Sequence, residues 1–238
     1  MHNETIPEVE KKSSLYLLDK LRDQFKESFD LIIHHEWMID LLNSKLSLEQ
    51  FESFITQEAH IYDLLARKVL NFAINNSLDD YDELMRIGIF LYSESSENLR
   101  PLDDEYPLSC LTRSYCEDLE KVWNGSSYPH KLLTLIFPLW IREGVYHLLK
   151  SEETYIHHFK VWTERLLNNS PQELISSLGR IMRQSFIKTY GSNEKTSFYE
   201  EGFKDLEHLL SSLMQFELSV CNHSYQINFN QVQQSNQH

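Results

Sequence analysis

The sequence predicts an all-α protein, and three observations support this fold class. Apolar residues recur at spacings of three and four along most of the chain. The 238 residues include only six Gly and six Pro, too few for the many tight turns of a sandwich or barrel. No β-type alternation, internal repeat or interdomain linker stands out. We predict one domain over residues 1–225, a bundle of about eight helices, followed by a flexible polar tail over residues 226–238.

The first three predicted helices follow from periodicity and from one capping signal. An apolar stripe that begins at Leu15 and ends at Ile32 predicts the first helix. Ser47 opens the second, because its side chain can cap the helix while Gln50, three residues later, reaches back. The predicted ranges of the second and third helices are 47–75 and 81–96.

The remaining helices are predicted from their boundary residues. An acidic loop follows Pro101, and Asn124-Gly125 ends the fourth helix. Pro129 starts the fifth, Ser151 caps the sixth, and Ser170-Pro171 begins the seventh. The predicted ranges are 108–122, 129–149, 151–167, a seventh helix from 170 onwards, and 197–221.

Charge and cysteine usage limit the partners that we expect. The formal net charge of −14 opposes binding to nucleic acid or to anionic lipid. The three cysteines are an odd number at spacings that fit no zinc motif. The N-terminus lacks the apolar core of a secretory signal, and no apolar run approaches ~20 residues. We therefore expect a reduced, cytoplasmic protein without a membrane span.

Glu58 is the first candidate site residue, because it lies within an apolar helical stripe. It falls three or four residues from Phe54, Ile55, Ile61 and Tyr62, which places its carboxylate on the buried face. Burying a carboxylate is costly unless it is hydrogen-bonded, paired or needed for chemistry. Glu58 is thus either a catalytic acid or a structural one that a nearby Tyr, His or Arg satisfies.

A second candidate pair lies on the fifth predicted helix. Glu143 and His147 extend an apolar stripe that includes Trp140, and they are one turn apart. Such a pair could bind a metal, act as an acid and a base, or satisfy each other in the core. A metal would need further ligands, and the cluster at 201–208 faces away from its own apolar stripe. We predict neither a metal nor a cofactor.

Four segments resemble the TenA/thiaminase II family, in matching order and spacing. Residues 35–58 resemble the opening of that family, with a His at 35, a Leu before a turn, an inward Phe and a Gln-acid pair at 57–58. Residues 135–140 resemble its Leu-rich segment, Trp162 resembles a Trp in the next helix, and residues 198–203 resemble its Tyr-Glu-x-x-Phe signature.

The resemblance implies a haem-oxygenase-like all-α fold, a central pocket and a homo-oligomer, either a dimer or a tetramer. It also implies hydrolysis of the amino group from aminopyrimidines in thiamin salvage, or cleavage of thiamin. By position, Glu58 and Glu200 become the catalytic acids, and Pro138 stands where the family has a catalytic Cys. A branch of the family lacks that Cys and uses a pocket Glu, a role for which Glu143 is a candidate.

Three functions are consistent with these residues. The leading hypothesis is a Cys-independent TenA-like hydrolase of an aminopyrimidine or a related thiamin-derived compound. One alternative is a catalytically inactive protein of the same fold that binds a ligand or another protein. A third is a metal-dependent oxidase that would use Glu58, Glu143, His147 and residues of the last helix. The catalytic candidates are Glu58, Glu143 and Glu200, and the substrate-binding candidates are His35, Tyr62, Trp140, His147 and Tyr199.

Overall fold

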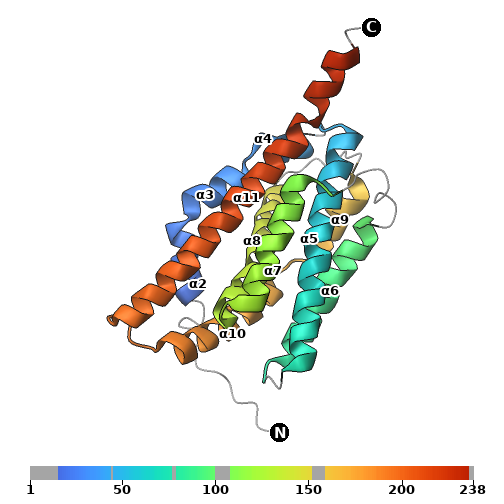
Figure 1. Cartoon of the computed structure of the whole chain (residues 1–238). Helices are drawn as coiled ribbons and strands as arrows, with labels where there is room; N and C mark the ends of the chain where they lie inside the picture. Colours follow the sequence, from blue (N-terminus) through green and yellow to red (C-terminus); the bar gives the residue numbers. More distant parts are fainter. Residues whose placement is uncertain (1–15, 44, 77–78, 100–107, 152–158, 236–238) are drawn as a thin grey trace.

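The computed structural model describes residues 16–43, 45–76, 79–99, 108–151 and 159–235. This part of the chain contains ten α-helices and no strand, which confirms the all-α prediction (Figure 1). The helices are α2 (Tyr16–Gln24), α3 (Lys26–Ile33), α4 (Glu36–Leu42), α5 (Leu48–Asn75), α6 (Tyr81–Leu99), α7 (Cys110–Gly125), α8 (Tyr128–Ser151), α9 (Lys160–Asn168), α10 (Gln172–Tyr190) and α11 (Ser197–Ser235).

Two short helices, α2 and α3, replace the single first helix that the periodicity predicted, and α4 follows in a segment for which no helix was predicted. Phe25 leaves helical geometry, with φ −104° and ψ 15°, and separates α2 from α3. His35 then begins α4, because its Nδ1 accepts a hydrogen bond from the backbone N–H of Trp37 at 3.1 Å. The apolar stripe continues across the break at Phe25, so periodicity alone could not reveal it.

The capping box predicted at Ser47 is confirmed. Ser47 Oγ accepts from the backbone N–H of Gln50 at 3.1 Å, and Gln50 Oε1 accepts from the backbone N–H of Ser47 at 3.0 Å. This cap starts α5, which packs along α6 and also contacts α7 and α11. Because α5 carries Glu58, the cap fixes the start of the helix that positions this candidate site residue.

The fifth predicted helix is α8, and it lies in the core. By length and composition it could cross a membrane, although the sequence analysis expected no such segment, but 78% of its apolar stretch is buried inside the bundle. That burial is typical of the core helix of a helical bundle. Ser151, predicted as the cap of the next helix, is instead the last residue of α8, and α9 begins at Lys160.

The C-terminal helix is longer than predicted. Periodicity ended the last helix at about Cys221, whereas α11 continues to Ser235. It contacts α3, α4, α5, α7, α8 and α10, and its C-terminal end projects beyond the other helices (Figure 1). The helical backbone therefore enters the polar segment 226–238.

Two groups of buried apolar side chains make up the core. The larger group joins α2, α3 and the central parts of α5, α6, α7, α8, α10 and α11. The smaller group includes Trp37, Phe51 and Phe159, and the last two rings stack with centroids 3.8 Å apart. On α5, Phe54 and Ile55 belong to the smaller group, and Ile61 and Tyr62 belong to the larger one. Glu58 lies between them, where the two groups meet.

We predict that Ser47→Ala lowers the free energy of unfolding by about 1 kcal/mol, because the first turn of α5 loses its side-chain acceptor. Urea denaturation followed by circular dichroism measures the change. Ser219→Ala is the matched control, since Ser219 is exposed within α11 and its hydroxyl only donates to the carbonyl of Gln215. That control should change stability by less than about 0.5 kcal/mol. Equal effects of the two substitutions would contradict the importance of the cap.

Candidate functional site

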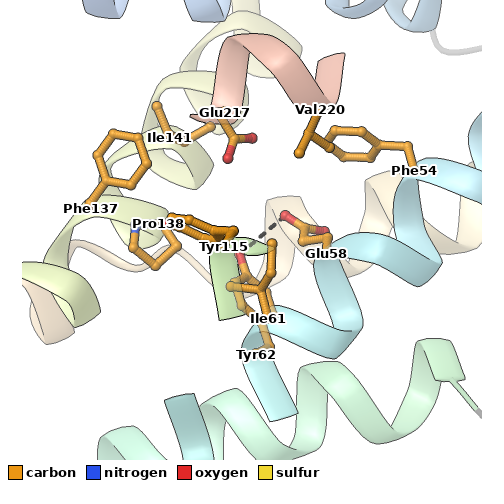
Figure 2. Close-up of a pocket in the computed structure, with 10 residues that line it drawn as sticks. All are labelled: Phe54, Glu58, Ile61, Tyr62, Tyr115, Phe137, Pro138, Ile141, Glu217 and Val220. Atoms are coloured by element: carbon orange, nitrogen blue, oxygen red, sulfur yellow. Dashed lines mark hydrogen bonds between the residues drawn. The ribbon is translucent and has the colours of Figure 1, made fainter. Parts of the chain in front are cut away.

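A pocket lies between α5, α7, α8 and α11, and it encloses about 400 Å³ of space that is partly open to solvent. Most of its wall is apolar or aromatic, and two carboxylates enter it from different helices (Figure 2). An apolar wall with a few polar groups is typical of small-molecule sites. Its lining residues are Phe54, Glu58, Ile61, Tyr62, Tyr115, Phe137, Pro138, Ile141, Glu217 and Val220.

Glu58 and Tyr62 lie one turn apart on α5 and form a hydrogen bond. The hydroxyl of Tyr62 donates to Glu58 Oε1 at 3.2 Å. The second oxygen, Oε2, is buried and has no hydrogen-bond partner among the described residues. A buried acceptor without a donor typically costs about 1–3 kcal/mol.

Glu217 enters the same pocket from α11, and its carboxylate points toward the space that Glu58 also faces (Figure 2). Burial and, to a smaller extent, the charge of Glu58 raise the pKa of Glu217 to about 8. Burial also raises the pKa of Glu58, while the nearby Arg142 guanidinium opposes that rise. Burial and the nearby charge of Glu58 thus favour the protonated form of Glu217 near neutral pH.

Behind Glu58, two arginines surround one buried glutamate. Arg142 Nη2 lies 2.9 Å from Glu94 Oε2, and Arg165 Nε lies 3.5 Å from the same oxygen. The side chains of Arg142 and Glu94 are each only 4% exposed. Arg142 also forms a hydrogen bond with Tyr62, and its charge favours the ionised form of Glu58. The arginine cluster is therefore coupled to the pocket through Tyr62 and Glu58.

An aromatic stack closes the pocket beside Glu217. The rings of Tyr115 and Phe216 are parallel within 4°, with centroids 3.6 Å apart. Burial and then the charge of Glu217 raise the pKa of Tyr115 well above its usual value, so its hydroxyl stays protonated and can donate. Tyr115 thus offers the pocket a hydrogen-bond donor next to the second carboxylate.

Two of the sequence-predicted site residues, Glu58 and Tyr62, lie together in the pocket wall. Glu143 lies elsewhere, since its Oε2 pairs with Arg22 Nη1 of α2 at 3.0 Å. The helical repeat explains this, because Glu143 is two residues from Ile141, about 200° around α8 from the face that lines the pocket. The sequence placed Glu143 on the correct buried helix but not on this face.

The other sequence-predicted residues are spread over the molecule. Trp140 is buried against Phe29, with ring centroids 5.5 Å apart, and Tyr199 is buried against Phe186 at 5.0 Å. His147 and Glu200 are exposed. His35 caps α4, and its Nε2 lies 3.2 Å from Asn222 Oδ1. None of these five side chains lines the pocket.

Sequence reasoning missed Glu217, Glu94 and Arg142, although a signal for Glu217 and for Arg142 was present. Glu217 interrupts the apolar stripe of α11 three residues before Val220, in the same way that Glu58 interrupts the stripe of α5. Arg142 similarly follows the buried Ile141 on α8. The signal is a charged side chain at an apolar position of the repeat, and searching every helix for it would have found them.

Metal ligation was among the open alternatives. Within the described residues, no group of three or more His, Cys, Asp or Glu side chains is close enough to hold a metal ion. Glu58, Glu143 and His147 in particular do not converge, because Glu143 pairs with Arg22 and His147 is exposed. The pocket wall contains two carboxylates, those of Glu58 and Glu217.

We predict that Glu217→Gln flattens the dependence of stability on pH. The pKa of Glu217 rises from 4.5 to about 8 on folding, so the native state keeps a proton that the unfolded chain releases. This contribution to stability is complete below about pH 4.5 and is lost as the pH rises towards 8. Glu217→Gln should therefore lose less stability than wild type between about pH 5 and pH 8, by roughly 1–3 kcal/mol.

Urea denaturation at several pH values measures this difference. Glu201→Gln is the control, because Glu201 is exposed on the same helix and should leave the pH dependence of wild type unchanged. Identical pH dependence in wild type and Glu217→Gln would show that Glu217 ionises freely in the folded protein.

Comparison with known proteins identifies solved structures that share this fold. No protein-family model matches the chain, and neither does any curated protein. Among solved structures, a TenA homologue from Pyrococcus furiosus superposes with a TM-score of 0.73 at 11% identity, over 88% of this chain and 100% of that one. A TenA homologue from P. horikoshii gives 0.70 at 17% identity, over 88% and 98%.

A third structure carries an enzyme name. It is named as a TenA-like thiaminase from Sulfolobus solfataricus, and it superposes with a TM-score of 0.58 at 14% identity, over 93% of this chain and 97% of that one. All three likenesses extend over nearly the whole chain, while sequence identity is low. The chain therefore has the fold of the TenA homologues, and the fold expected from the sequence resemblance is confirmed.

Proposed function

We propose that the protein is a TenA-like hydrolase that acts, without a cysteine nucleophile, on an aminopyrimidine or a related thiamin-derived compound. The observation that carries the proposal is the pair of carboxylates, Glu58 and Glu217, that face one apolar pocket with raised pKa values. The solved structures that share the fold support it, since one of them is named as a TenA-like thiaminase.

The pair can supply both proton transfers of a hydrolysis. One carboxylate, ionised, takes a proton from a water molecule that attacks the carbon bearing the amine. The other, protonated, gives its proton to the departing nitrogen, so that R–NH₂ and water become R–OH and ammonia. The proton taken from water remains on the pair, and the site returns to its starting charge. Glu58 suits the base role because Arg142 and Tyr62 favour its ionised form, and Glu217 suits the acid role.

The apolar wall suits a planar ring. Phe54, Phe137 and Ile141 offer apolar surface, while Tyr115 and the carboxylates offer the few polar groups that would orient it. Pro138 lines the pocket at the position where the family resemblance expects the nucleophilic Cys. With Pro138 in that place, the chemistry assigned here is direct attack by water rather than formation of a covalent intermediate.

A second candidate function is ligand binding without turnover. The specific observation in its favour is Pro138, which offers the pocket no reactive atom. The two carboxylates with raised pKa values argue against this function, because burying a carboxylic acid destabilises a protein and such groups are often kept for chemistry.

Homo-oligomerisation and a cytoplasmic location stay predictions.

We expect Glu58→Gln and Glu217→Gln each to lower kcat by about 100-fold or more, because each substitution removes one proton-transfer group while keeping its shape. The measurement is release of ammonia or of the pyrimidine product from aminopyrimidine and thiamin substrates. Glu201→Gln, exposed on α11, should retain the wild-type rate.

Glu143→Gln belongs in the same series, because the sequence alone nominated Glu143. A loss as large as that of Glu217→Gln would return the acid-base role to Glu143. If the folded wild-type protein turns over none of these substrates but binds them, the ligand-binding function replaces the hydrolase.

A further inference from the structure

Gln57 directly precedes Glu58 on α5, and the pocket does not explain why it is buried. Its side chain is only 3% exposed, although glutamine usually lies at the protein surface. It is not among the residues that line the pocket. Successive residues of a helix point about 100° apart, so Gln57 faces a different neighbour from Glu58. That neighbour is the start of α7.

Ser109 is the N-cap of α7, and its local contacts supply one half of a capping box. Ser109 Oγ accepts from the backbone N–H of Thr112 at 3.0 Å. In a complete capping box, the side chain of the third helical residue accepts from the N-cap N–H in return. Thr112 holds that position in α7, and its hydroxyl lies 2.9 Å from Ser109 Oγ instead. The acceptor for the backbone N–H of Ser109 therefore comes from elsewhere.

Gln57 supplies this acceptor from another helix. The backbone N–H of Ser109 donates to Gln57 Oε1 at 2.9 Å, across 52 positions of the sequence. Gln50 provides the same bond within the capping box of α5, so the two helix starts use the same chemistry. A hydrogen bond of this kind allows little change in the distance between donor and acceptor. The bond therefore fixes the start of α7 relative to α5.

The position of α7 matters to the pocket because this helix carries Tyr115. Tyr115 lies about 9 Å along the helix from Ser109, less than two turns away. Its ring lines the pocket (Figure 2). The same ring stacks on Phe216 of α11, with centroids 3.6 Å apart. The far end of α7 is tied to α8, where Trp123 Nε1 donates to Thr134 Oγ1 at 3.1 Å. Gln57 thus holds the end of α7 that is nearer to Tyr115.

We propose that Gln57 is a positioning residue, whose bond to the Ser109 N–H holds α7 so that Tyr115 lies in the pocket wall beside Glu217. Two consecutive residues of α5 then shape the pocket. Glu58 enters it directly, and Gln57 acts through α7 on the opposite wall. This inference deepens the proposed function and rests on it only for the expected effect on turnover.

The stack of Tyr115 on Phe216 gives a readout that needs no substrate. The NMR signals of a ring that lies flat against another ring are shifted upfield. Phe216→Leu identifies the signals of Tyr115 in protein that contains isotope-labelled tyrosine. We expect Gln57→Met, which keeps the chain length but removes the acceptor, to lose most of this upfield shift. Gln57→Glu keeps an oxygen in the same place and should retain the shift.

Thr134→Val is the matched control. It also removes one buried hydrogen bond between α7 and a neighbouring helix, but at the end of α7 farther from Tyr115. The upfield shift of Tyr115 should persist in this variant. An unchanged shift in Gln57→Met, or an equal loss in Gln57→Met and Thr134→Val, overturns the proposal.

Hydrogen exchange of the wild-type protein decides the question even if Gln57→Met folds poorly. The backbone amide of Ser109 should exchange slowly with solvent, because Gln57 Oε1 accepts its hydrogen. Exchange at the rate of an amide without a hydrogen bond overturns the proposal.

Turnover separates this inference from the hydrolase. On the aminopyrimidine substrate, Gln57→Met and Tyr115→Phe should each lower kcat/KM about tenfold, because each removes the effect of one hydrogen bond. The double variant should lose no more than either single variant, since both changes act through the same hydroxyl. Additive losses overturn the positioning role. If wild type turns over no substrate, the hydrolase is removed, and the stack and the exchange of Ser109 still decide the role of Gln57.

Discussion

The ion pair between Arg142 and Glu94 is the constraint on which the rest of the site depends. It joins α8 to α6 inside the core, where both side chains are almost completely excluded from solvent. Breaking a buried ion pair by removing one partner typically costs about 3–5 kcal/mol. Arg165 of α9 approaches the same carboxylate, so three helices share one electrostatic centre.

This cluster of charges affects the ionisation of the neighbouring carboxylate, Glu58. Arg142 favours ionisation of Glu58, whereas burial and the charge of Glu94 oppose it. Burial and the charge of Glu58 raise the pKa of Glu217 to about 8. In the proposed hydrolysis, the arginine beside Glu58 favours its role as the base, and the raised pKa of Glu217 favours its role as the acid.

The sequence predicted the fold well and the site only in part. Helix periodicity and the Ser47 cap identified α5 and α8 closely, because both helices bury one face and have clear boundary residues. The division of the first helix at Phe25 was missed, since the apolar stripe is continuous there. Glu58 was found from its place in an apolar stripe, and the same signal at Glu217 was overlooked.

What the sequence could not supply was the pairing of helices distant along the chain. Glu143 is buried, as its stripe indicated, yet its partner Arg22 lies 121 positions away. Glu58 and Glu217 likewise meet only because α11 packs beside α5. A single sequence shows which face of a helix is buried but not what lies across from it, so a site built from several helices needs the three-dimensional arrangement.

Pro138 also bears on how readily this site could change. A proline within a helix has no N–H to donate to the carbonyl four residues earlier, and its ring crowds that turn, at a cost of about 3 kcal/mol. α8 nevertheless continues through Pro138 to Ser151, and neighbouring helices bury most of its apolar stretch. Almost any other residue at this position would restore a backbone hydrogen bond. The backbone is therefore no obstacle to a side chain with a nucleophilic atom at this position of the pocket wall.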